Sequence, residues 1–450
     1  MGQYDIIKHV NRHFKLSNYD WRQITMKTRT HLPSWHRLDN AANVFPLISH
    51  KNFSNVFRLA VEMKTSVNPQ LLQKALDITL PYFGNFNFKI RSGFFWYYFE
   101  PTNTRLLIQM ESLRPCAYVD TKMKHHHLFR ILYYKNRISL EVFHAITDGT
   151  GAMHFLTELT VNYLKLVSGE SLPEVGPRRK IKSELEDSYK KYYKKMKHTK
   201  KHIPRAFKFK GKRLPINTLG VLHGFLDVDA VIDYSRSIDV TLTEYIASTY
   251  LWAIYSTSLD DDKKKRPIHL AVPINLRRFF ESKSNMNFFS HITVAIEKSS
   301  VPLTFELILA SVKEQFRTQI TKENMLENIS KEVALSRNPL TRIVPLLLKN
   351  IFVKIIHLKT IQSYTTTLSN VGKIEMPEKW ANDVAHFELV MNATSVDPMK
   401  CTICTYQNKM VVTISSQLED TRIQSAFFRK LASDGLNVTI ESNGAYYEIL

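Results

Sequence analysis

One six-residue segment, from His144 to Gly149, carries residue types that could perform acid–base chemistry: it reads His-Ala-Ile-Thr-Asp-Gly. It directly follows the alternating stretch 138–143, and alternate side chains of a strand point to the same face. His144 therefore shares a face with apolar residues, and a neutral imidazole there is suited to act as a general base near neutral pH. Asp148 and Gly149 end the strand and turn the chain into the helical pattern of residues 150–164.

Two other interpretations compete with a catalytic role for His144. In the first, His144 is a hydrogen-bonded core histidine, and Asp148 is only the N-cap of the following helix. In the second, His144 and Asp148 lie four positions apart on a helix and bind a metal ion. The strand-like residues before His144 and the presence of Gly149 argue against that second interpretation.

The cysteines, and the histidines other than His144, do not predict a metal or redox site. Cys401 and Cys404 form a CxxC pair, but they lie in a predicted strand, where positions three apart face opposite sides. The three neighbours 125–127 are all histidines and cannot all face one ion. We therefore expect no bound metal, and the three cysteines, which include Cys116, fit a reducing compartment better than a disulfide framework.

The hexad resembles the HxxxDG motif of the chloramphenicol-acetyltransferase-like superfamily, which includes the condensation domains of non-ribosomal peptide synthesis and bacterial alcohol acetyltransferases. Residues 35–46 are similar to the N-terminus of the alcohol acetyltransferase branch. Residues 271–280 resemble a strand with an Asn-x-Arg element, and residues 366–372 resemble an SNxG segment. These elements come in the expected order and span most of the chain, from about residue 35 to residue 372.

The length of the chain and this resemblance lead to the same fold class. A chain of 450 residues exceeds what one hydrophobic core normally supports, so two domains are expected. The resemblance implies an α/β fold of two chloramphenicol-acetyltransferase-like domains, each a mixed β-sheet flanked by helices, with the active site at the interface. Residues 1–175 would form the N-terminal half with HxxxDG, residues 176–215 a basic linker or crossover, and residues 216–450 the C-terminal half.

The resemblance also implies roles for individual residues. His144 would be the general base, and Asp148 would point away from the substrate toward Arg277, bracing the turn across the interface. Gly149 would let another part of the chain pass close by. Candidates for binding the oxyanion or the substrate come from the SNxG-like segment: Ser369, Asn370 and Thr367, together with Thr366.

The expected activity is transfer of an acyl group, with acetyl as the first expectation, from a coenzyme A thioester to an alcohol or amine. Acyl-CoA would be a co-substrate, and no bound cofactor is expected. The sequence contains neither GxGxxG nor GxxxxGK, which removes the usual support for a nucleotide-binding fold. The alternatives are an acyltransferase that takes its donor from a carrier protein, and a non-catalytic relative that binds its ligand through the same fold.

The positive charge of the chain is concentrated in one segment. The net charge is +21, and residues 178–213 account for +13 of it, with 16 lysines and arginines against three acids. Such a run can be a solvated face, can steer an anionic cofactor such as coenzyme A, or can contact an anionic membrane surface. Nucleic acid is not expected, because no recognised motif accompanies the charge. The chain has no signal-peptide pattern and no long apolar run, so we expect a cytoplasmic protein, with peripheral membrane contact as the alternative.

Local patterns predict several elements that would surround the site. Asn68 and Pro69 would begin a helix over residues 67–80, and residues 129–143 would form a hairpin in which Asn136 takes a positive φ. Residues 241–244 match a capping box that would begin the next helix. Residues 343–356 predict an apolar helix carrying two lysines, which we expect to be buried between the domains, with a membrane surface as the alternative.

Overall fold

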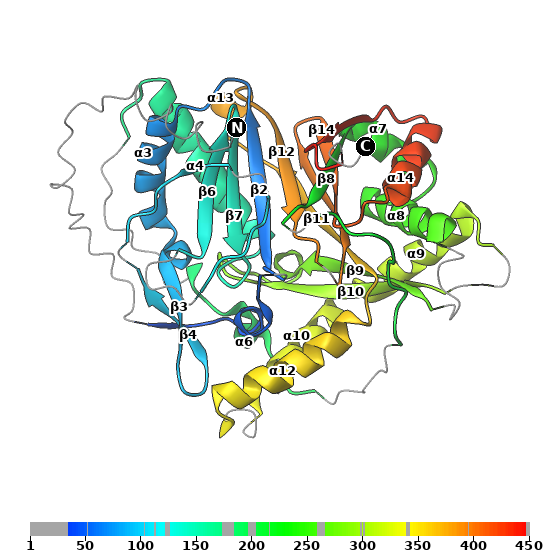
Figure 1. The fold of residues 1–450 in the computed structure, drawn as a ribbon, viewed down its shortest axis with the longest axis horizontal. Helices are drawn as coiled ribbons and strands as arrows, with labels where there is room; N and C mark the ends of the chain where they lie inside the picture. Colours follow the sequence, from blue (N-terminus) through cyan, green and yellow to red (C-terminus); the bar gives the residue numbers. More distant parts are fainter. Residues whose placement is uncertain are drawn as a thin grey trace, which may run out of the picture. The chain divides into compact units, whose positions relative to one another are not determined.

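The computed structural model describes residues 35–446, apart from residues 52, 103, 112–113, 122–126, 173–183, 197–203, 216, 259–265, 298, 300–301, 339–342 and 395. The described strands form three sheets, two of them large, and helices pack against both large sheets (Figure 1). Both large sheets are mixed, which confirms the α/β class with two mixed sheets and flanking helices.

The first large sheet has five strands in the order β12-β2-β7-β6-β5, and only the pair β5 and β6 is parallel. Its strands are β2 (Val56–Met63), β5 (Gln109–Met110), β6 (Phe129–Tyr134), β7 (Arg137–Phe143) and β12 (Val384–Met391). Helices α3 (Pro69–Thr79) and α4 (Gly149–Val167) contribute to the same apolar core. Because β12 comes from late in the sequence, this sheet joins two distant parts of the chain.

The second large sheet has seven strands in the order β10-β9-β11-β13-β14-β8-β15, in which β11 runs parallel to both of its neighbours. Its strands are β8 (Gly220–Asp227), β9 (Ile268–Asn275), β10 (Phe289–Ile296), β11 (Thr366–Ile374), β13 (Met399–Tyr406), β14 (Lys409–Ser416) and β15 (Thr439–Ser442). The core beside it includes side chains of α7 (Val228–Ser237), α8 (Leu242–Ser258), α9 (Phe305–Gln319), α10 (Lys322–Arg337) and α14 (Arg422–Ser433).

Smaller elements complete the described part of the chain. A three-stranded sheet has the order β1-β4-β3, from β1 (His36–Arg37), β3 (Phe88–Ser92) and β4 (Tyr97–Pro101). The remaining helices are α2 (Phe45–Ile48), α6 (Ser188–Tyr192), α12 (Leu346–Ile361), α13 (Glu378–Ala381) and the 3-10 turns Leu80–Tyr82, Gly84–Asn87 and Leu276–Arg278. Within the described residues, no helix combines the length and the apolar character needed to span a bilayer.

Capping predictions made from local sequence are confirmed. The side chain of Asn68 accepts hydrogen bonds from the backbone N–H groups of Gln70 and Leu71, and α3 begins at Pro69. At the head of α8, Glu244 accepts from the N–H of Thr241 at 2.7 Å, and the Thr241 hydroxyl accepts from the N–H of Glu244 at 3.2 Å. Both caps are local, because every partner lies within three residues of the capping side chain.

The hairpin prediction is right in its strands and wrong in one detail. Strands β6 and β7 pair as expected, but Lys135 takes the positive φ, at 50°, in place of Asn136. The Asn136 side chain instead donates to the carbonyl oxygen of Met63 at 3.0 Å. Asn136 therefore contacts the neighbouring strand β2, while Lys135 adopts the left-handed conformation.

The CxxC pair lies on β13, and its two thiols face different cores, as the strand period requires. Cys401 belongs to the core of the seven-stranded sheet, whereas Cys404 belongs to the core of the five-stranded sheet. Cys404 Sγ also donates to the carbonyl oxygen of Phe387 on β12 at 3.0 Å. β13 therefore packs against both halves of the fold.

Two other segments are the apolar helix near residue 350 and the basic segment 178–213. The prediction that the apolar helix near residue 350 is buried is wrong: Leu347, Phe352 and Ile356 on α12 are 80%, 61% and 55% exposed. The basic segment holds only the five-residue helix α6 among its described residues, and Tyr189 on that helix is fully buried, its hydroxyl donating to the carbonyl oxygen of Phe289 at 2.6 Å. Residues 178–183 and 197–203 of that segment lie outside the described residues.

Candidate active site

His144 stands immediately after the last residue of β7, where the strand period brings it to the edge of an apolar pocket. Its backbone N–H donates to the carbonyl oxygen of Asn55 at 2.9 Å, which fixes the chain as it leaves the sheet. The imidazole stacks on Phe45 with ring centroids 4.7 Å apart, and Phe57 and Phe289 lie 5.0 and 5.4 Å away. Three aromatic rings from separate elements therefore confine the side chain.

A hydrogen-bonded chain from the far side of the interface holds one ring nitrogen of His144. Nδ1 lies 3.0 Å from Oδ1 of Asn287, and Asn287 is almost fully buried. The amide nitrogen of Asn287 donates to Oδ2 of Asp39 at 3.0 Å, and the backbone N–H of Asn287 donates to the same oxygen at 3.2 Å. Asp39, Asn287 and His144 thus form one continuous chain.

This chain selects the ring tautomer. The carboxylate of Asp39 accepts from the amide nitrogen of Asn287, so the amide oxygen must face the imidazole. An amide oxygen can only accept, which places the ring proton on Nδ1. Nε2 is then the nitrogen of His144 that can take a proton from another molecule.

Burial determines the charge preference of these groups. Burial lowers the pKa of His144 below its ordinary value of 6.5, and the field of Lys400 adds a small amount. A hydrogen bond with its own backbone, the charge of Asp148 and the hydrogen bond with Asn287 oppose this shift. The imidazole is therefore neutral at physiological pH and can accept a proton. Burial, with a smaller contribution from Asp187, also raises the pKa of Asp39 to about 7.

Asp148 turns away from His144 and pairs with Arg277 across the interface. Arg277 Nη1 lies 2.7 Å from Asp148 Oδ2, and both side chains are largely buried. The same oxygen accepts from the backbone N–H of Phe288 at 2.8 Å, and Oδ1 accepts from the N–H of Gly151, so Asp148 is also the N-cap of α4. Both carboxylate oxygens are thus occupied, which suits a positioning role.

Arg277 also organises the loop that carries Asn287. Its Nη2 donates to the carbonyl oxygens of Ser284 at 2.9 Å and Met286 at 2.7 Å. The N–H of Phe288 donates to Asp148, so the residues immediately before and after Asn287 are both held by the ion pair. The ion pair therefore acts on His144 through the loop. The neighbouring Arg278 is exposed.

Two glycines let chain segments approach closely at the start of α4. A Cβ at Gly149 would lie 3.0 Å from Val371 Cγ1. A Cβ at Gly151 would lie 2.2 Å from Thr147 Oγ1 and 2.3 Å from the carbonyl oxygen of Asn285, which no side chain could tolerate without movement. The close approach that the sequence suggested for Gly149 is therefore tighter at Gly151.

The pocket beside His144 has a volume of about 110 Å³ and draws on both large sheets. The first sheet and the start of α4 supply part of the lining: Phe57, His144, Asp148, Gly149, Thr150, Leu389 and Met391. The second sheet supplies the rest: Pro273, Asn275, Phe289, Ser369, Asn370 and Val371. The pocket therefore requires both sheets in place.

The SNxG-like segment forms part of β11, and its candidates have different surroundings. Ser369 lines the pocket, and its hydroxyl makes no hydrogen bond to any of the described residues. Asn370 also lines it, but its amide donates to Thr243 at 2.9 Å and accepts from the N–H of Gly372 at 2.8 Å, at a bulge where Gly372 has a φ of 82°. Thr367 is not among the lining residues, and Thr366 is buried and donates to the carbonyl oxygen of Met399.

Sequence reasoning did not identify Asn287, Asp39, Phe45 or Phe289 as site residues. Asp39 and Phe45 do lie in the segment 35–46, which the resemblance had marked without assigning a role. Asn287 lies 143 positions from His144 in a segment without a recognised motif, so no local signal pointed to it. Within the described residues, no cluster of three or more potential metal ligands occurs.

Comparison with known proteins gives matches at the level of structure alone. No family model and no curated protein matches the chain. The first condensation domain of the calcium-dependent antibiotic synthetase is similar with a TM-score of 0.60 and 11% identity, over 91% of this chain and 100% of that one. The trichothecene 15-O-acetyltransferase TRI3 from Fusarium sporotrichioides is similar with a TM-score of 0.58 and 12% identity, over 89% and 94%.

A third similar structure is the starter condensation domain of rhizomide synthetase, a mutant in complex with C8-CoA, with a TM-score of 0.55 and 9% identity. The similarity covers 90% of this chain and 98% of that one. Similarity over so much of the chain takes in both mixed sheets. The chain therefore has the same two-lobed α/β fold as these condensation domains and the acetyltransferase TRI3.

Proposed function

We propose that the protein is an acyltransferase that moves a short acyl group from a coenzyme A thioester to a hydroxyl or amine, with His144 as the general base. The observation that carries this proposal is the chain from Asp39 through Asn287 to His144, because it leaves Nε2 as a proton acceptor in a pocket that both sheets line. A histidine with only a packing role would not require a fixed tautomer beside a cavity.

In the proposed reaction, the acceptor oxygen or nitrogen loses its proton to Nε2 of His144 as it attacks the thioester carbonyl. The carbonyl π-electrons move to oxygen, which gives a tetrahedral oxyanion. When the oxyanion collapses, the C–S bond breaks, and the thiolate of coenzyme A takes the proton back from the imidazolium. The histidine thus ends each cycle neutral, as its lowered pKa favours.

Two features could stabilise the oxyanion. Ser369 contributes a hydroxyl to the pocket wall, and the N-terminus of α4 at Gly149 and Thr150 contributes the positive end of a helix dipole. Asn370 is less suited, because its side chain already bonds to Thr243 and Gly372. Ser369 is therefore our preferred donor.

The proposed donor and acyl group rest on the volume of the cavity and on what similar proteins bind or transfer. A cavity of about 110 Å³ has room for an acetyl group, the first expectation from the sequence. The rhizomide starter condensation domain binds C8-CoA, so a coenzyme A ester is compatible with this fold in one similar protein, and TRI3 is a 15-O-acetyltransferase. An alcohol acceptor is accordingly the first to test.

The test is thiol release from a panel of acyl-CoAs with pooled alcohols and amines, comparing the wild-type protein with His144→Ala. We expect acceptor-dependent release that falls by about 10²-fold to 10⁴-fold in the variant. His291→Ala is the matched control, because this histidine is exposed, bonds to Tyr364 and does not line the pocket.

The outcomes separate the alternatives. If release requires an acceptor and is lost only in His144→Ala, the proposal holds. If the wild-type protein is silent with every acyl-CoA but active with an acyl carrier protein, and His144→Ala is silent with both donors, the donor assignment is wrong and the base assignment stands. If His144→Ala retains full activity while folded, His144 is not the base.

A further inference from the structure

Helix α12 exposes an apolar face to solvent. The side chains that pack against the protein recur at helical spacing, at Leu346, Lys349 and Val353, while the opposite side is open. The open side carries seven large apolar residues, each between 48% and 80% exposed: Leu347, Leu348, Ile351, Phe352, Ile355, Ile356 and Leu358. A contiguous exposed apolar face of this kind marks a binding surface.

The β3–β4 hairpin extends this face at the start of α12. Phe94 is 72% exposed and Phe95 is 41% exposed, and the two rings pack edge to face. The carbonyl oxygen of Phe94 accepts from the N–H of Leu346 at 2.8 Å, and that of Phe95 accepts from Lys349 Nζ at 2.9 Å. The hairpin tip is thus hydrogen-bonded to the helix, and the two form one apolar surface.

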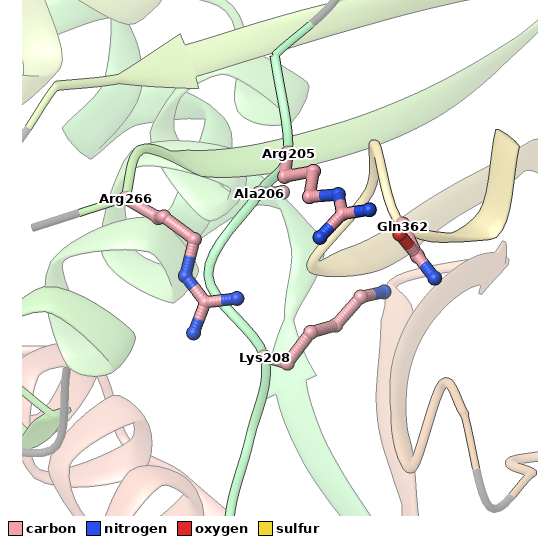
Figure 2. Close-up of a pocket in the computed structure, with 5 residues that line it drawn as sticks. All are labelled: Arg205, Ala206, Lys208, Arg266 and Gln362. Carbon is pink, nitrogen blue, oxygen red and sulfur yellow. The ribbon is translucent and has the colours of Figure 1, made fainter. Parts of the chain in front are cut away.

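A cationic cavity lies at the other end of α12. It has a volume of about 250 Å³, and its lining residues within the described part of the chain are Arg205, Ala206, Lys208, Arg266 and Gln362, none of them acidic. Figure 2 shows the two guanidinium groups and the ammonium group around one space beside Gln362, the residue that follows α12. One wall of the cavity is bonded to the helix, because Lys208 Nζ donates to the carbonyl oxygen of Ile361 on α12 at 2.7 Å.

The charges of the helix itself have the same sign. Helix α12 contains Lys349, Lys354 and Lys359 and no acidic residue. Lys354 and Lys359 are exposed beside the apolar side chains, whereas Lys349 is buried against the ring of Trp96. An apolar face with lysines beside it is the pattern of helices that lie in a membrane interface, and a cationic cavity suits a phosphate group.

We propose that α12, the hairpin tip at Phe94 and Phe95, and the cavity of Arg205, Lys208 and Arg266 together form a docking surface for an anionic phospholipid bilayer. The apolar side chains enter the boundary between headgroups and acyl chains, and the cavity receives a lipid phosphate. The charge complementarity favours this occupant over an uncharged apolar protein surface. This surface contains none of the residues assigned to the acyl transfer above.

The test is sedimentation of the full chain with vesicles of equal parts phosphatidylglycerol and phosphatidylcholine, and with vesicles of phosphatidylcholine alone. We expect the wild-type protein to bind the anionic vesicles and to bind the neutral ones about tenfold or more weakly. The double variant Phe352→Gln/Ile355→Gln and the double variant Arg205→Gln/Arg266→Gln should each weaken binding to anionic vesicles by about tenfold.

Matched controls replace exposed residues of the same kind elsewhere on the protein. Leu307 and Ile440 are 56% and 49% exposed, so Leu307→Gln/Ile440→Gln removes apolar surface outside the proposed docking surface. The exposed arginines 236 and 429 provide the charge control as Arg236→Gln/Arg429→Gln. Both controls should bind anionic vesicles as the wild-type protein does, and thermal unfolding should be similar for all four variants.

Three outcomes would overturn the proposal. The first is a wild-type protein that binds neither kind of vesicle. The second is a loss of binding that is equal in the docking-surface variants and in the controls. Such a loss would indicate non-specific electrostatic or hydrophobic adsorption to the vesicles. The third is a lipid-free wild-type dimer that Phe352→Gln/Ile355→Gln converts to a monomer, which would assign the face to a second copy of the chain. None of these readouts uses enzymatic activity, so failure here leaves the acyltransferase proposal standing.

Discussion

Asn287 holds His144 by its amide oxygen, 3.0 Å from Nδ1, while its amide nitrogen is bound to Asp39. The residue between the proposed general base and a carboxyl group is therefore neutral, and Asp39 affects the imidazole by orienting the amide of Asn287. Asp148, the acid of the HxxxDG motif, is committed to Arg277 and to the N-terminus of α4.

Replacing Asn287 by alanine should lower kcat by about 10²-fold, because Nδ1 would lose the acceptor that keeps its proton and the ring could adopt the other tautomer. KM for the acyl-CoA should change little, since Asn287 does not line the pocket. Steady-state kinetics test this split. Asn162→Ala is the control, because Asn162 is a buried amide on α4 bonded to Thr79. Equal losses in both variants would show a general structural effect.

The acidic limb of the pH profile should lie below the ordinary histidine value. The neutral imidazole is the active form, and burial lowers the pKa of His144, so activity should persist as the pH falls through 6.5 and decline only below it. The measurement is kcat/KM against pH with an acceptor that does not titrate in this range. Because the pKa of Asp39 is raised to about 7, the same profile is measured for Asp39→Asn. An inflection at or above pH 6.5 that persists in that variant would contradict the burial argument.

Breaking the ion pair between Asp148 and Arg277 should destabilise the fold strongly. Asp148→Asn or Arg277→Gln leaves a largely buried partner uncompensated, which costs about 3 kcal/mol in the free energy of unfolding. Urea unfolding measures this, and the double variant should lose less than the sum of the two. The half-exposed pair Glu327 and Lys331 on α10 is the control, where removal should change stability by no more than about 0.5 kcal/mol.

Ser369→Ala should lower kcat by about 10²-fold if the hydroxyl donates to the oxyanion, with KM nearly unchanged. Asn370→Ala should instead act mainly on stability, because its amide ties the bulge at Gly372 to Thr243. Parallel kinetics and unfolding curves distinguish these effects. A Ser369→Ala protein with wild-type kcat would remove this residue from the mechanism.

Gly151→Ala should destabilise the protein by about 1 to 3 kcal/mol, although alanine ordinarily favours a helix over glycine. The added methyl group would overlap Thr147 Oγ1 and the carbonyl oxygen of Asn285. Gly149→Ala meets only the methyl group of Val371 at 3.0 Å and should cost less. Urea unfolding of the two variants ranks them, and an equally small effect in both would refute the steric argument.

Features that depend on neighbouring residues could be predicted from the sequence. The caps at Asn68 and at Thr241 need partners only two or three positions away, and the alternation before His144 is a property of one strand. The resemblance to the HxxxDG motif predicted that Asp148 pairs with a distant arginine. Hydrophobic periodicity alone could not have predicted this pair. The caps and the alternation follow from local backbone geometry and hold whatever the rest of the chain does.

Features that depend on distant residues were decided by the tertiary structure. Asn287 reaches His144 from a loop that the ion pair of Asp148 and Arg277 and two hydrogen bonds to Asp39 position. No local pattern distinguishes it from other asparagines. The apolar helix α12 has the composition of a core helix, and only the packing of the remaining chain leaves its open side uncovered. Periodicity shows which face of an element is apolar, whereas the elements that fold next to it determine what that face contacts.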